Sequence, residues 1–143
     1  MPFGAPSAPP ALGGADWRGL RWHGSRAGGG MGSHLRHEVL GHVVSIIGMV
    51  RGVVGRIERR DRDLGRQLRR AANSVGSNVV EGFGNRDGNA RLRFSSARGS
   101  LYEVEGQLAM AVAWGYVSAD EVEPIQESLG RLGGRIYGLE RRR

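Results

Sequence analysis

The sequence predicts an all-α fold, an antiparallel up-down bundle of four helices. Four stretches carry apolar residues spaced alternately three and four apart, which places one apolar stripe along each helix and lets it run nearly parallel to a partner. Short segments separate the stretches, as in helix bundles. The 143 residues fit one domain with enough apolar material for a core. The chain has no cysteine, so a disulfide framework and a thiolate metal site are excluded.

Residues 1–30 differ in composition from the rest of the chain. They contain every proline except Pro124, many glycines and alanines, and no apolar period. We therefore expect a disordered arm ahead of a bundle formed by residues 31–143, and Met31 is a candidate for the true start of the protein. The arm lacks the basic start and unbroken apolar core of a secretory signal peptide, so we expect a cytoplasmic protein. Two tryptophans and two arginines offer the arm an alternative role, contact with nucleic acid. These residues are Trp17, Arg18, Arg21 and Trp22.

The first predicted helix runs from about Leu35 to Glu58 and is apolar on more than one face. Its apolar centre of about a dozen residues is too short to cross a membrane, which takes about 20, so we expect no membrane segment. Three glycines lie seven residues apart on it, and each costs roughly 1 kcal/mol against alanine. They are Gly41, Gly48 and Gly55. Either the glycines are neutral, or a second subunit approaches closely there, and the extra apolar surface favours an oligomer.

The second predicted helix, Leu64 to about Gly82, carries a row of arginines along one side. The row consists of Arg62, Arg66, Arg69 and Arg70. Such a row is usually a solvated helix face. Here only Asp61 and Asp63 are near in the sequence to neutralise four guanidinium groups, so contact with phosphate is an equal alternative.

The third predicted helix, Ala90 to about Trp114, begins with Arg91 and Arg93, which we add to the candidate phosphate contacts. The last apolar stripe predicts a fourth helix over Val122–Leu139. All 21 basic residues are arginine against 14 acidic ones, for a net charge of +7. Coding bias in a GC-rich genome explains the lack of lysine, but whatever its origin the charge favours a polyanionic partner. Nucleic acid, bound without sequence preference, comes before a membrane surface.

Two glycines, Gly82 and Gly84, stand at the predicted end of the second helix. Both suit a left-handed helix cap, and Asp87-Gly88 suits the turn that follows. The Gly-x-Gly spacing is not a nucleotide-binding loop, because it follows a helix rather than a strand and the rest of the phosphate-binding pattern is missing.

A chain of motifs links the second and third predicted helices. It consists of Gln67–Val75, Ser77–Gly82, Phe94, Ala97–Glu103, Gln107-Leu108 and Gly115-Tyr116. These motifs resemble the four-helix-bundle proteins encoded in intervening sequences of bacterial 23S ribosomal RNA genes. The resemblance covers about Leu35 to Leu139 and is strongest from Leu64 to Tyr116. The chain departs from the family in the glycines of its first helix and in the N-terminal arm.

The same family includes the accessory variability determinant of diversity-generating retroelements. Those proteins are similar pentameric barrels of four-helix subunits that associate with a reverse transcriptase and bind nucleic acid through a basic surface. The resemblance therefore implies a homopentameric barrel. It also implies an accessory role, in which the protein holds RNA or an RNA–cDNA duplex beside a reverse transcriptase. The alternative that it implies is an intervening-sequence protein of undefined structural role.

A catalytic site is not indicated by the polar residues of the shared motifs. We interpret them as a structural motif, in which a capping amide and an ion-pair network join the second and third helices. The motif consists of Asn78, Glu81, Gly82, Arg98, Gly99 and Glu103. No Ser/His/Asp order or carboxylate pair stands out, so we expect no enzyme and no cofactor.

Histidines near the start of the first helix offer a third, weaker alternative, a metal-binding bundle. His34, Glu38 and His42 lie four apart on one helix face, with His37 adjacent. They lack a closing ligand from another helix, and the paired Glu-x-x-His motifs of a di-iron bundle are absent. We therefore expect no metal.

Overall fold

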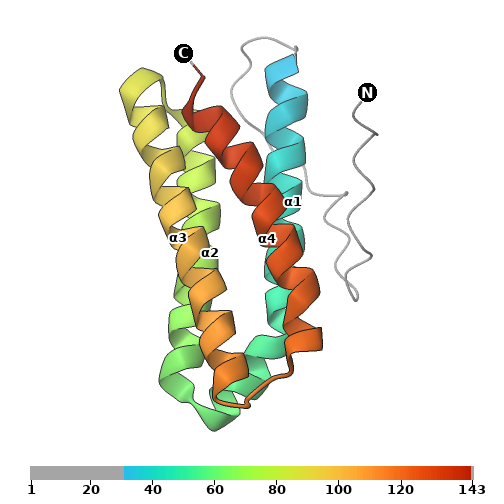
Figure 1. Ribbon diagram of the computed structural model, residues 1–143. Coiled ribbons are helices and arrows are strands. Elements are labelled where there is room, and N and C mark those ends of the chain that lie inside the picture. Colours follow the sequence, from blue (N-terminus) through green and yellow to red (C-terminus); the bar gives the residue numbers. More distant parts are fainter. Residues whose placement is uncertain (1–30, 143) are drawn as a thin grey trace.

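The computed structural model describes residues 31–142 and shows four helices (Figure 1). They are α1 (Met31–Arg60), α2 (Arg62–Gly84), α3 (Asp87–Ala113) and α4 (Ala119–Glu140). No strand occurs within the described residues, so the predicted all-α, four-helix architecture is confirmed. Each helix begins before its predicted start, and α1, α2 and α4 also end beyond their predicted ends, because the apolar stripe marks only the turns that face the core; α3 ends at Ala113, one residue before the predicted Trp114. The predicted arm, residues 1–30, lies outside the described residues.

Consecutive helices run in opposite directions and pack side by side (Figure 1). α2 packs most extensively on α3, while α1 packs on α2 and on α4, and α3 packs on α4. The connection between α1 and α2 and the loop between α3 and α4 lie at one end, which we call the α1–α2 end. The turn between α2 and α3 lies at the opposite end, the α2–α3 end, together with the start of α1 and the end of α4 (Figure 1).

The four predicted apolar stripes form one continuous core between the helices. Every residue of the four stripes is buried, and none is more than 9 % exposed. The stripes consist of Val39, Val43, Ile46, Val50, Val53 and Ile57; Leu64, Leu68, Ala71, Val75 and Val79; Phe94, Ala97, Leu101, Val104, Leu108 and Ala111; and Val122, Ile125, Leu129, Leu132, Ile136 and Leu139. Burying a large aliphatic side chain contributes about 1.5–3 kcal/mol, so these stripes supply most of the driving force for the fold. The predicted core is therefore confirmed at every position.

Asp61 joins α1 to α2 and also holds the neighbouring loop. It is the N-cap of α2, and its carboxylate accepts a hydrogen bond of 3.0 Å from the backbone N–H of Leu64. The second carboxylate oxygen accepts a hydrogen bond of 3.3 Å from the hydroxyl of Tyr116, in the loop between α3 and α4. One side chain thus ties together the two connections at the α1–α2 end.

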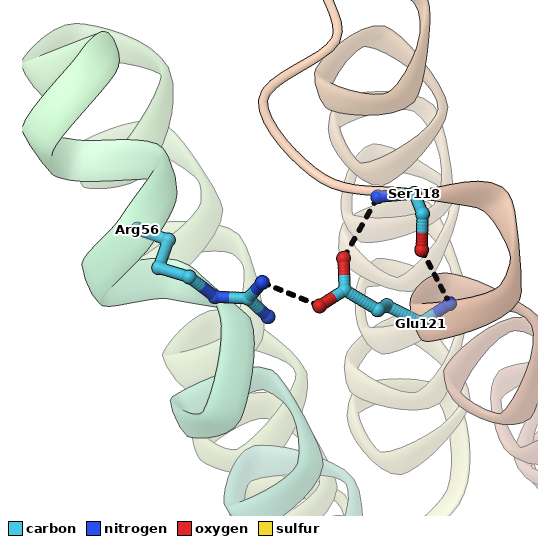
Figure 2. Close-up of polar contacts among 3 residues, drawn as sticks. All are labelled: Arg56, Ser118 and Glu121. Atoms are coloured by element: carbon cyan, nitrogen blue, oxygen red, sulfur yellow. Dashed lines mark hydrogen bonds and ion pairs between the residues drawn. The ribbon is translucent and has the colours of Figure 1, made fainter.

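The loop between α3 and α4 is closed by defined caps on both sides. Gly115, at φ 75°, ends α3, with its N–H on the carbonyl of Val112 at 2.9 Å. α4 then begins with a capping box, in which Ser118 and Glu121 exchange hydrogen bonds (Figure 2). The carboxylate of Glu121 also pairs with Arg56 of α1 (Figure 2). The box therefore fixes both the start of α4 and its position against α1.

The predicted left-handed cap at Gly82 and Gly84 is wrong. α2 continues as a helix through Gly84, and the residues with positive φ in the described chain are Asp87 and Gly115. Asp87 and Gly88, predicted as a turn, begin α3 instead. The turn needs only two residues, and Gly82 serves another purpose: a Cβ at this position would lie 2.6 Å from Cε1 of Phe94. The glycine is required for close packing of α2 on α3.

α1 is long and apolar enough to cross a membrane by length and composition alone. The sequence estimate of a dozen apolar residues was therefore too short. Half of this window is buried inside the bundle, and the core helix of a water-soluble bundle has the same composition. The apolar character of α1 is accounted for, in that half, by the contacts it makes with α2 and α4.

Candidate nucleic-acid interface

The four arginines predicted on the second helix share one exposed side of α2, which we call the α2 arginine face. It consists of Arg62, Arg66, Arg69 and Arg70. The buried residues Leu64, Leu68 and Ala71 alternate with them along the same turns and point to the core. With 3.6 residues per turn, this spacing directs the arginines away from the core. The described structure thus places all four where the sequence predicted them.

An acid from α1 enters the α2 arginine face. Glu58 forms a two-point ion pair with Arg69, with its Oε1 2.6 Å from Nε and its Oε2 3.1 Å from Nη2. The hydrogen bond from Arg69 lowers the pKa of Glu58, and the charges of Arg66 and Arg62 lower it further. The carboxylate therefore stays ionised and offsets one of the four positive charges. The spacing of residues on one helix could not show this pair, because Glu58 belongs to the preceding helix.

The two acids that the sequence placed beside these arginines are occupied elsewhere. Asp61 caps α2 and holds Tyr116, and Asp63 accepts a hydrogen bond of 2.8 Å from Gln67. Within residues 31–142, Arg62, Arg66 and Arg70 form no ion pair. Guanidinium groups bind phosphate oxygens in pairs and stay charged at every physiological pH. This surface suits phosphate binding rather than proton transfer.

Arg91 and Arg93 do not join the α2 arginine face. Arg93 forms an ion pair of 2.8 Å with Glu81, which lies eleven residues beyond Arg70 on α2, a distance of roughly 16 Å along a helix. Arg91 lies near the α2–α3 end, together with Arg86, which the sequence analysis did not single out. The six predicted arginines therefore form two separate basic regions.

The predicted capping amide has a different role. Asn78 lies within α2, and its Nδ2 donates to the carbonyl oxygen of Ser74 at 2.9 Å and to its hydroxyl at 3.2 Å. The hydroxyl of Ser74 lies 2.8 Å from that of Ser100 on α3. Asn78 thus supports a polar link between α2 and α3 rather than a helix end. The two serines form this link, and in the sequence they were visible only as members of the shared motifs.

The predicted ion-pair network between α2 and α3 is only partly present. Glu81 of α2 does pair with Arg93 of α3. Arg98 instead pairs with Glu140 of α4 at 3.0 Å and lies over the ring of Tyr137, 4.9 Å from its centroid. The side chain of Arg98 is 27 % exposed, so this pair is partly shielded from water. Arg98 therefore holds α3 to α4.

Two further members of the structural motif make no contact that explains them. Gly99 lies on the exposed side of α3, and a Cβ there would meet nothing within 4 Å. Glu103 is exposed and lines a cavity of about 290 Å³ between α2 and α3, with Arg70 and Gln107. Neither residue is needed for packing within the described chain. Both are therefore available to contacts outside it.

The histidines do not form a cluster. His34 lies 3.7 Å from Glu38 at the surface, whereas Nε2 of His42 lies 2.9 Å from the hydroxyl of Ser128 on α4. No group of three His, Asp or Glu side chains within the described residues is placed to hold a metal ion. Burial lowers the pKa of His42 to about 4, and the charges of Arg135 and Arg131 act in the same direction.

No curated protein matches the chain closely enough to name a relative. The family model of the 23S rRNA-intervening sequence protein matches residues 54–138, more than half of the chain. The match runs from the last turns of α1 to the last turns of α4 and includes the whole α2 arginine face. The chain therefore belongs to the 23S rRNA-intervening sequence protein family.

Proposed function

We propose that this family member is a non-catalytic accessory protein that binds RNA or DNA without sequence preference. The observation that carries the proposal is the α2 arginine face, where Arg62, Arg66 and Arg70 are exposed and form no ion pair with the described residues. Phosphate contacts of this kind position a nucleic acid and release counterions, but they do not read its bases. We place the protein in the cytoplasm, where such a partner is present.

An exposed apolar surface on α3 supports assembly into a homo-oligomer. It lies on the side of α3 opposite the core, with residues three and four apart, and we call it the α3 seam. The seam consists of Leu92, Ser95, Gly99, Tyr102, Gly106, Ala109 and Ala113. Leu92 and Tyr102 are each 62 % exposed, and nothing lies within 4 Å of a Cβ built at Gly106. Small residues at this spacing allow another helix to approach closely.

A closed ring, which we propose contains five subunits, would repeat the α2 arginine face around one axis. A polyanion crossing several subunits would meet a dense band of arginines, and its affinity would fall steeply with salt. In this proposal the partner protein is a reverse transcriptase, beside which the ring holds RNA or an RNA–cDNA duplex. The alternative is a structural intervening-sequence protein without such a partner. The family match itself favours this alternative.

The binding test removes two unpaired arginines from the α2 arginine face. Changing Arg66→Gln and Arg70→Gln together should weaken binding about equally for unrelated RNA and duplex sequences. It should also flatten the dependence of log K on log salt by roughly one unit per lost phosphate contact in each subunit engaged. Thermal stability should change little, because exposed arginines contribute little to it. Fluorescence anisotropy at several salt concentrations measures both quantities.

The matched control removes the same charge from α4. Arg131→Gln with Arg135→Gln lowers the net charge equally, but on a helix that does not pack extensively against α2. Equal losses in both double variants would show that only net charge matters and that the α2 arginine face is not the site. A parent protein that binds no nucleic acid even at low salt would end the proposal. The neighbouring genes separate the two proposed functions: a reverse transcriptase gene supports the retroelement role, and a position inside a 23S gene supports the alternative.

A further inference from the structure

A cavity of about 480 Å³ opens at the α2–α3 end and has an apolar floor with a basic rim. We call it the corner pocket. The floor consists of Phe83, Ala90, Phe94 and Leu139, and the rim carries Arg86, Arg91 and Arg142. Gly82, Asn85 and Asp87 complete the lining. Three separate segments, the end of α2, the start of α3 and the end of α4, meet here, so no single stretch of sequence shows the pocket.

The floor presents a fixed aromatic surface. Phe94 is 5 % exposed, and the ring of Phe83 packs edge to face against it, with centroids 5.3 Å apart and an interplanar angle of 79°. Gly82 brings α2 close to the ring of Phe94. A flat apolar group entering the pocket would therefore meet mainly the partly buried ring of Phe83. The buried ring of Phe94 holds the Phe83 ring in place, which lowers the entropy lost on binding.

The rim arginines form no ion pair with a described residue, whereas two other arginines of α3 do. Arg93 is paired with Glu81 and Arg98 with Glu140, whereas Arg86, Arg91 and Arg142 form no ion pair with a described residue. Arg86 is the N-cap of α3 and makes no side-chain capping bond, so backbone N–H groups of the first turn of α3 also remain available to an anion at this rim.

Two polar side chains also line the corner pocket, and one of them, Asp87, offsets part of its positive charge. Asp87 contributes a carboxylate to its lining and begins α3 at φ 51°. Asn85 uses its amide to donate a hydrogen bond of 2.8 Å to the carbonyl oxygen of Glu81. With three guanidinium groups against one carboxylate, the pocket remains cationic. A ligand that fits has a flat apolar body, an anionic group, and N–H or O–H groups that can donate hydrogen bonds to the carboxylate of Asp87.

We propose that the corner pocket binds one unpaired nucleotide of a nucleic-acid strand. The base lies against the floor, where stacking on aromatic side chains tolerates any sequence, and the phosphate lies on the rim arginines. The volume is within the range of small-ligand sites. Bases in a duplex are already stacked and paired, so the pocket adds a preference for single strands that the α2 arginine face lacks. This inference rests on the proposed nucleic-acid function.

The first experiment uses the full chain and small ligands. Adenosine monophosphate, adenosine and ribose 5-phosphate are titrated into the labelled protein, and the amide signals of Gly82 and Ala90 are followed by NMR. We expect the monophosphate to shift both signals, and the other two ligands to bind at least roughly tenfold more weakly, because each lacks one of the two recognised groups. Equal binding of all three ligands, or no shift at either amide, would overturn the assignment.

The second experiment compares an unstructured 12-nucleotide RNA with a duplex of the same sequence. The parent should bind the single strand more tightly than the duplex, although both offer phosphate contacts. We call this ratio of affinities the single-strand advantage. The double change Arg86→Gln with Arg142→Gln should remove that advantage and leave duplex binding nearly unchanged. The control, Arg66→Gln with Arg70→Gln, should weaken strand and duplex alike and keep the advantage.

A third variant, Phe83→Leu, separates stacking from charge. It keeps an apolar side chain but removes the ring, so it should lower the single-strand advantage. Loss of the edge-to-face contact with Phe94 should also lower the melting temperature somewhat, so binding is measured well below the melting temperature of the variant. If the rim variants weaken strand and duplex equally, the corner pocket is only additional charge and the inference fails while the proposed function stands. If an acidic peptide with an aromatic residue shifts Gly82 and Ala90 and the nucleotide does not, the pocket binds protein instead. If the parent binds no nucleic acid, both proposals fail.

Discussion

Gly82 shows how one residue sets the distance between two helices. A Cβ at Gly82 would lie 2.6 Å from Cε1 of Phe94, a ring that is itself buried, so Gly82→Ala forces the ring or the helix to move. We expect a loss of about 1–3 kcal/mol in the free energy of unfolding, as for other overpacked cores. The matched change Gly84→Ala meets nothing within 4 Å and should be neutral or stabilising by about 0.5–1 kcal/mol. Urea denaturation measures both, and a harmless Gly82→Ala would contradict the packing argument.

His42 gives the bundle a pH dependence that can be assigned to one side chain. Burial lowers its pKa from 6.5 to about 4, so the unfolded chain takes up a proton at a higher pH than the folded one. This contribution to stability is complete above about pH 6.5 and is lost as the pH falls toward 4. His42→Gln can keep a hydrogen bond to Ser128 without titrating. We expect the melting temperature of the parent to fall more steeply between pH 7 and 5 than that of the variant; identical profiles would rule out His42 as the cause.

At the scale of elements, the start of α4 separates a strong local interaction from a weak long-range one. The hydroxyl of Ser118 accepts from the N–H of Glu121 at 3.2 Å, and Ser118→Ala should cost about 1 kcal/mol. Arg56→Gln removes only the partly exposed ion pair with Glu121 (Figure 2) and should cost at most about 1 kcal/mol, with values near zero common for such pairs. Ser118→Asp keeps a capping oxygen and serves as the control. Thermal unfolding of the three variants ranks them, and an Arg56→Gln loss larger than that of Ser118→Ala would reverse this order of importance.

At the scale of the whole molecule, the proposed oligomer requires one helix to form the interface between subunits. The sequence pointed to the glycines of α1, whereas exposure points to the α3 seam. We expect light scattering to give a closed oligomer near five subunits. Gly106→Leu should dissociate it without loss of helicity, because nothing within the subunit occupies that space. Gly52→Leu, at an equally open position on α1, should leave it intact. The opposite pattern would place the interface on α1, and a monomeric parent would remove the ring altogether.

The sequence by itself determined the four helices and their core. An apolar period of three and four is a local property of the chain, and it decides which side of each helix avoids water before any partner is chosen. For the same reason it predicted that Arg62 and Arg66 are exposed, since they lie opposite that stripe. Family membership followed from motifs along α2 and α3, which are also local.

Only the tertiary structure decided which residues meet across helices. Glu58 pairs with Arg69, and Arg98 pairs with Glu140 rather than with a residue of α2. Exposed ion pairs differ little in energy, so the axial positions and rotations of the packed helices determine which of them form. The sequence predicted a helix cap at Gly82, whereas the structure shows that this glycine makes room for the ring of Phe94. The corner pocket is made by three segments that are adjacent only after packing, so no period or motif in the chain could have described it.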